Sequence, residues 1–450
     1  MNDTIVALAT PPGVSGLAVI RLSGRDSIEI AEKCFNPKGK LINAPSHTIH
    51  FGWIVHKDIR IDNVTASIFI EPRSYTGENS VEISCHGGMV IVDELINALI
   101  DCGARMAEPG EFTRRAFLNG KMDLMQVEAV ADLIHSVTIP GAITAARQLH
   151  GEFTSRISNL RRKLLDICSL LELELDFSDE DLTFVKKDKI KDDVIDAISF
   201  CSSLAESYKA AEILRSGFFV GIAGFPNSGK STLFNALLKK KRAIVSETPG
   251  TTRDYLEETI ILNGMAVKLI DTAGLRETDN IIELEGIKLV QSILEQSNLV
   301  LVINDISISP EHSNELLTKL KKEYPKQEIL LVQNKIDKIN FKDIEKEDEI
   351  VYISAKTGEG IDYLEHILES AARKNIEGIT DVLINQRHAL LLKRIAEQLS
   401  LAVNSIDLGR ENELISLDIR NAVNLLGELS GENWNEDVLN NIFSRFCIGK

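Results

Sequence analysis

Near the middle of the 450-residue chain, the segment GFPNSGKS (Gly224 to Ser231) follows an apolar run and precedes a run typical of a helix. It fits the pattern G-x-x-x-x-G-K-[ST] in the strand, loop and helix order that this pattern requires. The glycines let backbone N–H groups turn inward around phosphates, and the amino end of the following helix adds partial positive charge. We therefore expect Lys230 to reach the β- and γ-phosphates and the Ser231 hydroxyl to ligate Mg²⁺. An ordinary glycine-rich turn is the alternative, which the flanking segments disfavour.

Apolar runs typical of strands recur from Phe218 onward, and helical segments separate most of them. The runs are FFVGIAG, AVKLIDTAG, NLVLVINDIS, EILLVQNKID and EIVYISAKTG. Such alternation indicates a mainly parallel sheet with helical crossovers. Asn263 and Gly264 form a pair typical of a hairpin, which predicts that the strand before them pairs with the strand after them. The phosphate loop is therefore expected to lie in an α/β domain.

Three short motifs follow the phosphate loop at the ends of predicted strands. In DTAG, Asp271 would hold the Mg²⁺ shell, and the backbone N–H of Gly274 would sense the γ-phosphate. In NKID, Asp337 can accept hydrogen bonds from N1–H and the 2-amino group of guanine, whereas adenine offers neither donor. The SAK segment (354–356) can pack on the base. The four motifs, in this order, predict a GTP-hydrolysing domain.

The residues predicted to bind GTP come from all four motifs and from one further loop. They are Asn227, Ser228, Gly229, Lys230, Ser231, Thr232, Ser246, Glu247, Thr248, Pro249, Gly250, Thr251, Thr252, Asp271, Thr272, Ala273, Gly274, Asn334, Lys335, Asp337, Ser354, Ala355 and Lys356. The further loop is SETPGTTRD (246–254), where a threonine can ligate Mg²⁺ and fold over the γ-phosphate. Its spacing predicts a switch that GTP orders and hydrolysis releases, with an ordinary loop as the alternative.

Leu275 is an unusual residue for the position that it occupies after DTAG. Many GTPases carry a glutamine there, and its side chain orients the attacking water, which a leucine cannot do. Another group must therefore position the water, and no arginine finger is evident from the sequence.

Charge and composition restrict the partners and the compartment of the chain. The formal net charge of −17 argues against broad, non-specific binding of nucleic acid, although it permits a local basic groove. The six cysteines are scattered without a C-x-x-C pair, as expected for reduced thiols in a cytosolic protein. The first residues lack the pattern of a signal peptide, and no apolar stretch is long enough for a membrane span. We expect a cytoplasmic protein.

Composition also divides the chain into segments. Residues 1–118 mix the strand-like runs GLAVIRLSG, VTASIFIEP and SVEISCHGG with the helical run MVIVDELINALIDCGA, while residues 119–215 and 377–450 carry apolar residues at helical spacing. Residues 216–376 hold the phosphate loop and its sheet. We therefore expect a multidomain protein, α/β plus all-α, in which an α/β domain is inserted between the two halves of a helical domain.

A resemblance to a known family extends over essentially the whole chain. It rests on GFPNSGKS, PGTTRD, DTAGLRET, NKID and the terminal FCIGK, and on TIVALATPPG, SYTGENSVEISCHGG and PGEFTRRAFLNGKMDLMQVEAVADLI. These segments resemble the MnmE (TrmE) family of tRNA uridine 5-carboxymethylaminomethyl modification GTPases, with the terminal Cys-Ile-Gly-Lys as the most specific mark. The resemblance implies an N-terminal α+β domain that binds folate and dimerises, a helical domain and an inserted P-loop G domain.

The resemblance also implies K⁺-dependent GTP hydrolysis, with G domains that pair across a homodimer. By match to the family, the K⁺ ligands are Asn227, Ser246, Thr248 and Thr251, and the Mg²⁺ ligands are Ser231 and Thr252. A monovalent cation beside the phosphates can supply charge stabilisation in place of an arginine finger. Glu283 matches the family's water-orienting glutamate, with Glu285 as a nearby competitor. Glu283, Lys230 and Thr252 are thus the expected catalytic residues.

Four charged residues match the family's positions for a 5-formyl- or 5,10-methylene-tetrahydrofolate. They are Arg21, Glu82, Lys121 and Lys450. A glutamate can accept from the amino and ring N–H groups of a pterin, while Arg and Lys suit its glutamyl carboxylates. On this interpretation the chain end folds back toward the N-terminal domain. Cys447 would then take part in the uridine chemistry as a thiolate, or be a buried structural thiol.

The resemblance implies a function in tRNA modification. The expected partners are a second copy of the chain, an FAD protein of the MnmG type in a heterotetramer or larger complex, and tRNA. Together they would install a 5-carboxymethylaminomethyl or aminomethyl group on the wobble uridine, with the folate as the source of the one-carbon unit. GTP hydrolysis would drive opening and closing of the G domains. The alternative is a GTP-switched RNA-binding or ribosome-assembly factor without modification chemistry.

Overall fold

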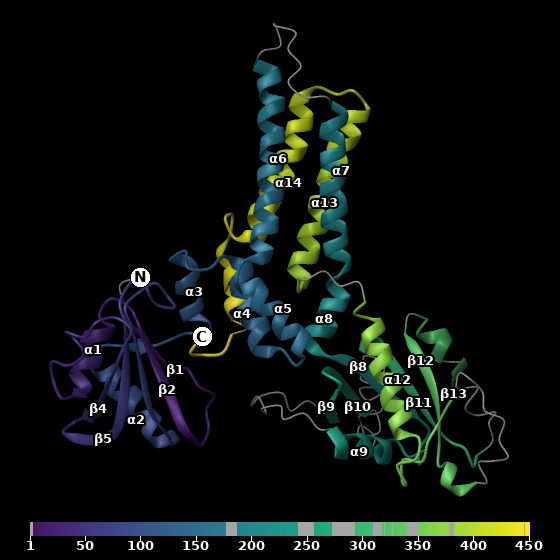
Figure 1. Ribbon diagram of the computed structural model, residues 1–450, viewed down its shortest axis with the longest axis horizontal. Helices are drawn as coiled ribbons and strands as arrows, with labels where there is room; N and C mark the ends of the chain where they lie inside the picture. Colours follow the sequence, from purple (N-terminus) through teal and green to yellow (C-terminus); the bar gives the residue numbers. More distant parts are fainter. Residues whose placement is uncertain are drawn as a thin grey trace, which may run out of the picture. The chain divides into compact units, whose positions relative to one another are not determined.

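The computed structural model divides into two compact units. It describes residues 3–176, 187–241, 256–271, 293–308, 317–318, 320–325, 327–339, 350–377, 382–444 and 446–450. The first unit comprises Met1–Ala131, Gln148–Ile190 and Leu401–Lys450, and the second comprises Asp132–Arg147 and Lys191–Ser400. Figure 1 follows the chain through both units by colour.

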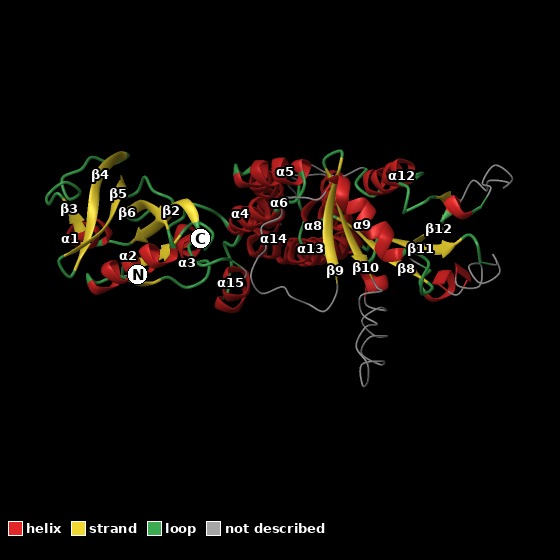
Figure 2. Cartoon of the chain, turned by 90° about the horizontal axis from the view of Figure 1, so that it is seen from below, coloured by secondary structure: helices red, strands yellow, loops and turns green. Residues whose placement is uncertain are grey.

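The first unit contains a sheet of seven strands in the order β3-β4-β5-β6-β2-β1-β7, of which β2 to β6 are labelled in Figure 2. Its strands are β1 (Ile5–Leu8), β2 (Ser15–Ser23), β3 (Phe35–Asn36), β4 (Thr48–His56), β5 (Ile59–Phe69), β6 (Ser80–Gly87) and β7 (Arg105–Met106). Neighbours are antiparallel except β1 and β7, which are parallel. The sequence predicted strands at β2, β5 and β6 but not at β1 or β4.

Strand alternation gives this sheet two different faces. Ala18, Ile20 and Leu22 of β2 belong to a buried core with α1 (Ser27–Cys34) and α2 (Met89–Asp101). Arg21 alternates with these residues and therefore faces the other side. On that side Phe112 of α3 (Glu111–Leu118) packs with Ile5 and Ala7 of β1.

Helices make up most of the remaining chain outside the second sheet. They are α4 (Leu124–His135), α5 (Ile139–Leu149), α6 (Glu152–Asp176), α7 (Lys187–Glu206), α8 (Tyr208–Ser216), α13 (Gln386–Asp407), α14 (Asn412–Ser430) and α15 (Glu436–Phe443). In the first unit α6 and α14 lie side by side and antiparallel (Figure 1), because Asn412 contacts Glu174 at one end and Arg161 contacts Glu432 at the other. None of the described helices is both long and apolar enough to cross a membrane.

The second unit contains a sheet of six strands in the order β13-β12-β11-β8-β10-β9. The strands are β8 (Phe218–Gly224), β9 (Leu256–Leu262), β10 (Met265–Asp271), β11 (Leu299–Asp305), β12 (Glu328–Asn334) and β13 (Ile350–Tyr352). All pairs are parallel except β9 with β10, which form the hairpin predicted at Asn263 and Gly264. The mainly parallel sheet is confirmed.

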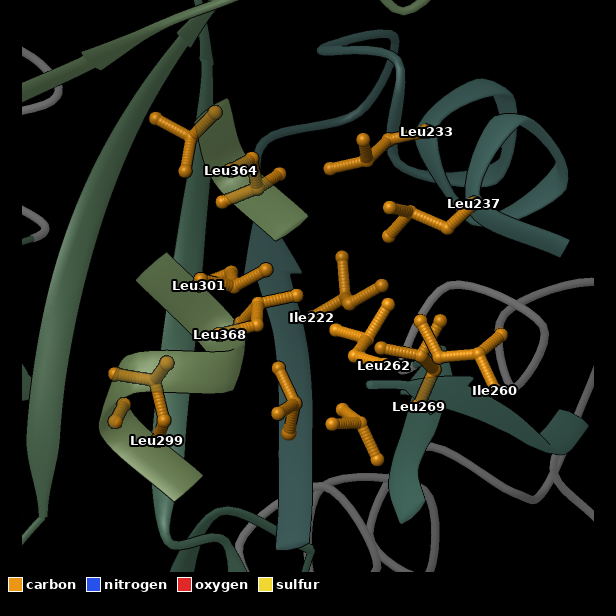
Figure 3. Close-up of a cluster of buried hydrophobic side chains, with 14 of the residues drawn as sticks. Ile222, Leu233, Leu237, Ile260, Leu262, Leu269, Leu299, Leu301, Leu364 and Leu368 are labelled. Atoms are coloured by element: carbon orange, nitrogen blue, oxygen red, sulfur yellow. The ribbon is translucent and has the colours of Figure 1, made fainter. Parts of the chain in front are cut away.

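Apolar side chains from strands and helices form the core of the second unit (Figure 3). Ile222 and Leu301 of the sheet face Leu233 of α9 (Lys230–Lys241) and Leu364 of α12 (Ile361–Lys374). Backbone pairing holds β8, β11 and β12 side by side with the same direction. Since the carboxyl ends of parallel strands meet at one edge, the loops after these three strands converge there.

Candidate functional site

The phosphate loop between β8 and α9 depends on glycines. Gly224 and Gly229 have φ angles of 147° and 96°, a region that L side chains rarely adopt. A Cβ atom on Gly229 would lie 2.3 Å from Asn334 Nδ2, and one on Gly224 would lie 2.3 Å from the carbonyl oxygen of Ile303. The loop therefore packs directly against the ends of the neighbouring strands, which leaves no room for side chains.

Polar groups inside the loop fit a phosphate ligand. Lys230 is 8% exposed, and its Nζ donates to the carbonyl oxygens of Gly224 (3.1 Å) and Phe225 (2.9 Å). Ser228 is 2% exposed, and its Oγ has no hydrogen-bond partner among the described residues. A buried polar group without a partner is costly, so an additional ligand is expected at this hydroxyl. Ser231 and Thr232 follow in the first turn of α9.

Asn334 joins three loops at the edge of the sheet. It is 1% exposed, and its Nδ2 donates to the carbonyl oxygen of Ser228 (2.9 Å). Its Oδ1 accepts from the backbone N–H groups of Lys335 (2.8 Å) and Ala355 (3.0 Å). One amide side chain thus connects the phosphate loop, the NKID segment and the SAK segment. The structure brings these three predicted motifs together.

The carboxylate of Asp337 lies exposed beside this junction. Its Oδ1 accepts from Ser354 Oγ at 2.6 Å, and this hydrogen bond lowers the pKa of Asp337. The side chain is therefore ionised at neutral pH and offers acceptors only. This is the chemistry that a pair of N–H donors on guanine requires.

Asp305 is a member of this cluster that the sequence analysis missed. It ends β11, lies opposite Asn334 in the sheet register and is 5% exposed. Its Oδ2 lies 2.6 Å from Nζ of Lys335, and its Oδ1 accepts from Ser307 Oγ (2.6 Å). Burial alone would raise the pKa of Asp305, but the hydrogen bonds from Lys335 and Ser307 lower it to about 2. Only its position at a strand end, as in VINDIS, could have indicated it.

Several predicted residues of the nucleotide site lie outside the described residues. They are Ser246, Glu247, Thr248, Pro249, Gly250, Thr251, Thr252, Thr272, Ala273, Gly274, Leu275, Glu283 and Glu285. Asp271 is the last residue of β10, and its backbone pairs with Ile222 of β8. The strand thus ends beside the phosphate loop, as predicted.

A second group of residues meets in the first unit: the predicted residues Arg21, Glu82 and Lys450, together with Tyr75 and Phe112, which the sequence analysis did not name. We call this cluster of five residues the terminal pocket. Arg21 and Glu82 are direct cross-strand partners on β2 and β6. The Nε and Nη2 atoms of Arg21 lie 2.9 and 2.8 Å from Oε1 of Glu82. The centre of the Arg21 guanidinium lies 5.2 Å from the ring centroid of Tyr75 and 5.8 Å from that of Phe112. These distances allow cation–π attraction.

The C-terminal tail ends beside the sheet of the first unit (Figure 1). Gly449 is buried against β1, where a Cβ atom would lie 2.1 Å from the carbonyl oxygen of Leu8. Burial lowers the pKa of Lys450, and the positive charge of Arg21 lowers it further, while Glu82 acts in the opposite direction. Arg21, Glu82 and Lys450 therefore share one electrostatic environment. The predicted return of the tail to the N-terminal sheet is present.

Two further predicted residues, Lys121 and Cys447, contact the segments that carry Tyr75 and Phe112. Lys121 is exposed, and its Nζ donates to the carbonyl oxygen of Pro72 (3.0 Å), at the start of the loop that carries Tyr75. Cys447 is exposed, so the alternative of a buried structural thiol is wrong. Its carbonyl oxygen accepts from the backbone N–H of Gly110 at 3.5 Å, which ties the tail to the start of α3.

A buried arginine supports the loop that carries Tyr75. Arg115 is 1% exposed, and its guanidinium contacts carboxylates of Asp3 (3.0 Å), Glu78 (3.2 Å) and Glu111 (3.0 Å). These contacts join the chain start, the loop and α3. Sequence reasoning missed Arg115, Tyr75 and Phe112, and the only signal was an arginine pair among the apolar residues of EFTRRAF.

Comparison with known proteins covers the whole chain. A family model described as the MnmE helical domain matches residues 124–447, and one described as the GTP-binding protein TrmE N-terminus matches residues 4–121. The tRNA modification GTPase MnmE of Christiangramia forsetii is 41% identical over 472 residues, covering 100% of both chains. That of Chlorobium chlorochromatii is 40% identical and covers 100% of this chain and 98% of its own.

Among solved structures, the G domain of the FeoB iron transporter of T. maritima is 29% identical to this chain. The match covers 34% of this chain and 98% of that domain, with a TM-score of 0.27. So low a score supports no conclusion about function.

Proposed function

Because the chain belongs to the MnmE family of tRNA modification GTPases, we propose that it uses K⁺-dependent GTP hydrolysis to modify the wobble uridine of certain tRNAs. The main observation in favour of GTP binding is the junction at Asn334, where the phosphate loop meets the two segments expected to contact guanine. The names of the relatives favour modification over the alternative of a binding factor alone.

The residues of the second unit fit a guanine nucleotide. The glycine-lined loop suits phosphates, as does the hydroxyl of Ser228, which has no hydrogen-bond partner within the described part of the chain, and Asp337 suits guanine. Lys230 would release its two loop carbonyls and turn its ammonium to the β- and γ-phosphates. The proposed GTP contacts otherwise remain those predicted from the four motifs.

Ser231 and Thr252 would hold Mg²⁺, and Asn227 would hold K⁺ together with Ser246, Thr248 and Thr251. Held by these residues beside the phosphates, the two ions would supply positive charge against the negative charge that develops during hydrolysis. Asn227 has a φ angle of 63°, so the backbone of the phosphate loop is left-handed at this residue. Glu283 would orient the attacking water, since Leu275 cannot.

The terminal pocket would hold the tetrahydrofolate derivative. Glu82 would accept from pterin N–H groups, and Arg21, Lys121 and Lys450 would face its carboxylates. The shared environment of Arg21, Glu82 and Lys450, lined by Tyr75 and Phe112, supports this assignment. The folate supplies the one-carbon unit for C5 of uracil. Cys447, which is exposed, is the candidate thiol for the uridine chemistry.

The assembly that we propose is a cytoplasmic homodimer with an FAD protein of the MnmG type and tRNA. We propose domain boundaries at residues 1–118, 119–215, 216–376 and 377–450, and the match of the TrmE N-terminus to residues 4–121 supports the first. The flavin partner is expected to carry the redox chemistry, because the sequence holds no G-x-G-x-x-G fingerprint.

Two measurements test this function. Release of inorganic phosphate from GTP should rise steeply when K⁺ replaces Na⁺, and equal rates in the two salts would contradict the K⁺ assignment. Mass spectrometry of tRNA nucleosides should show loss of the modified uridine in cells that lack the protein, restored by the wild-type gene. An unchanged nucleoside profile, with GTP hydrolysis intact, would instead support the binding-factor alternative.

A further inference from the structure

Asp305 and Lys335 form an ion pair that connects the two ends of the nucleotide site. The Nζ atom of Lys335 lies 2.6 Å from Oδ2 of Asp305 and also donates to the carbonyl oxygen of Asn227 at 2.6 Å. Asn227 belongs to the phosphate loop, while Lys335 lies two residues before the carboxylate expected to read guanine. One ammonium group therefore bridges the loop for phosphate and the loop for the base.

The backbone conformation of Lys335 is unfavourable by itself, so the bridge depends on the contacts of Lys335 with Asn334 and Asp305. Lys335 has a φ angle of 68°, in the left-handed region that non-glycine residues rarely adopt. Such a conformation persists only where surrounding contacts hold it. Asn334 holds the backbone N–H of Lys335 (2.8 Å), and Asp305 holds the ammonium at the other end of the side chain.

Contacts other than the one with Lys335 also hold the side chain of Asp305 in place. Its side chain is 6% exposed, and its Oδ1 accepts from both the backbone N–H (3.1 Å) and the hydroxyl (2.6 Å) of Ser307. Its second oxygen, Oδ2, is thereby directed at Lys335. Lys338 lies farther from the same oxygen, at 3.8 Å.

We propose that Asp305 is a positioning residue for guanine nucleotide binding. By holding the ammonium of Lys335 against the carbonyl of Asn227, it sets the spacing between the phosphate loop and Asp337. This inference rests on the proposed binding of GTP and adds a residue that none of the four sequence motifs contains.

The test is a double-mutant cycle in the full-length chain, read out as affinity for a fluorescent GDP analogue. Asp305→Asn keeps the size of the side chain but removes the charge, and we expect roughly a 10-fold loss of affinity, since the ion pair is only partly exposed. Lys335→Met keeps the apolar stem and should lose a similar factor. In the double variant the losses should not multiply, because both substitutions break the same contact.

A matched control is Glu369→Gln, which removes the carboxylate of another ion pair of the second unit, between Glu369 and Arg373 at 2.8 Å on α12. This variant should bind GDP as the wild type does. The proposal is overturned if Asp305→Asn binds within about twofold of the wild type, or if the losses of the two single variants multiply in the double variant. If the wild-type chain itself fails to bind guanine nucleotides, the proposed function fails instead.

Discussion

The phosphate loop and the terminal pocket organise their charges in opposite ways. In the loop, one lysine is held by backbone carbonyls, and Asn334 and Lys335 of the NKID segment contact the loop backbone. In the terminal pocket, two cations and one carboxylate come from β2, β6 and the end of the chain. The phosphate loop is shaped by the geometry of its own backbone and is held to distant segments by Asn334, whereas the terminal pocket consists entirely of side chains from distant segments.

This difference determines how each site responds to change. The loop has one charged side chain whose removal leaves the backbone cradle in place. The pocket has like charges in proximity, since Arg21 lowers the pKa of Lys450. Glu82, paired with Arg21, offsets part of the repulsion between the two cations, and an anionic ligand beside them would offset more. We therefore expect a single substitution in the phosphate loop to change GTP hydrolysis strongly, and single substitutions in the terminal pocket to change folate binding by smaller steps.

The largest expected effect is that of Lys230→Ala. It removes the ammonium assigned to the β- and γ-phosphates, and loss of one such group typically costs at least ~100-fold in rate. Phosphate release from GTP measures this loss. Binding of tetrahydrofolate, followed by calorimetry, should be unchanged, because the terminal pocket lies in the other unit. Equal loss of both activities would contradict the separation of the two sites.

The next largest effect is expected from Gly449→Ala. Gly449 has a φ angle of 98°, and the new Cβ atom would lie 2.1 Å from the carbonyl oxygen of Leu8, so the tail must move. Strain of about 1–3 kcal/mol should displace Lys450 and weaken folate binding roughly 10-fold.

Gly409→Ala is the matched control for the tail. Gly409 has a φ angle of 61° but nothing within 4 Å of the Cβ position. It therefore reports the cost of a left-handed alanine without a clash. If the two variants bind tetrahydrofolate equally well, the tail does not form part of the pocket.

A moderate effect is expected from Tyr75→Ala. The variant removes the ring beside the Arg21 guanidinium, an interaction worth about 1 kcal/mol, or fivefold in folate affinity. Tyr75→Phe keeps the ring and loses only the hydrogen bond between the hydroxyl and Thr113 Oγ1 (2.9 Å). It should bind folate nearly as the wild type does. An equal loss in the two variants would show that the hydroxyl, and not the ring, matters.

The smallest effect concerns the titration of Lys450. Its pKa in the docked tail is lowered from the ordinary value of 10.5, so a displaced tail binds the proton more tightly. Docking of the tail is therefore weakest at neutral pH and strengthens as the pH rises through the lowered pKa toward 10.5. NMR of the Lys450 Cε signal, assigned with Lys450→Arg, should show titration below that of exposed lysines, and titration together with them would refute the pocket.

Arg21→Gln refines the same titration. It removes the positive charge that lowers the pKa of Lys450, so the midpoint should move upward while the contribution of burial remains. A midpoint that stays fixed would show that the two side chains are farther apart than the account requires.

The sequence predicted the nucleotide site better than the terminal pocket for a physical reason. A phosphate loop needs particular residues at fixed spacing, and GFPNSGKS carries them within eight positions. Asp305 escaped prediction because its role arises from the register that places it opposite Asn334. Nothing in the local sequence of VINDIS records that pairing.

In the terminal pocket, local patterns carried less information. Tyr75 and Phe112 meet Arg21 because a loop and α3 pack on one face of the sheet, a contact that no periodicity reveals. Only the family resemblance joined Arg21, Glu82 and Lys450. Strand β4 was missed for a related reason, since Ile49 and Phe51 are 71% and 61% exposed and blur the expected alternation of buried and exposed residues.

The most direct test of the central claim is the nucleotide preference of Asp337→Asn. The claim is that this carboxylate, set beside the phosphate loop by Asn334 and Ser354, reads the N–H donors of guanine. We expect the variant to lose affinity for GDP and to gain affinity for xanthosine diphosphate, whose 2-carbonyl accepts from the new amide. A variant that still prefers GDP over xanthosine diphosphate, with wild-type affinity, would contradict it.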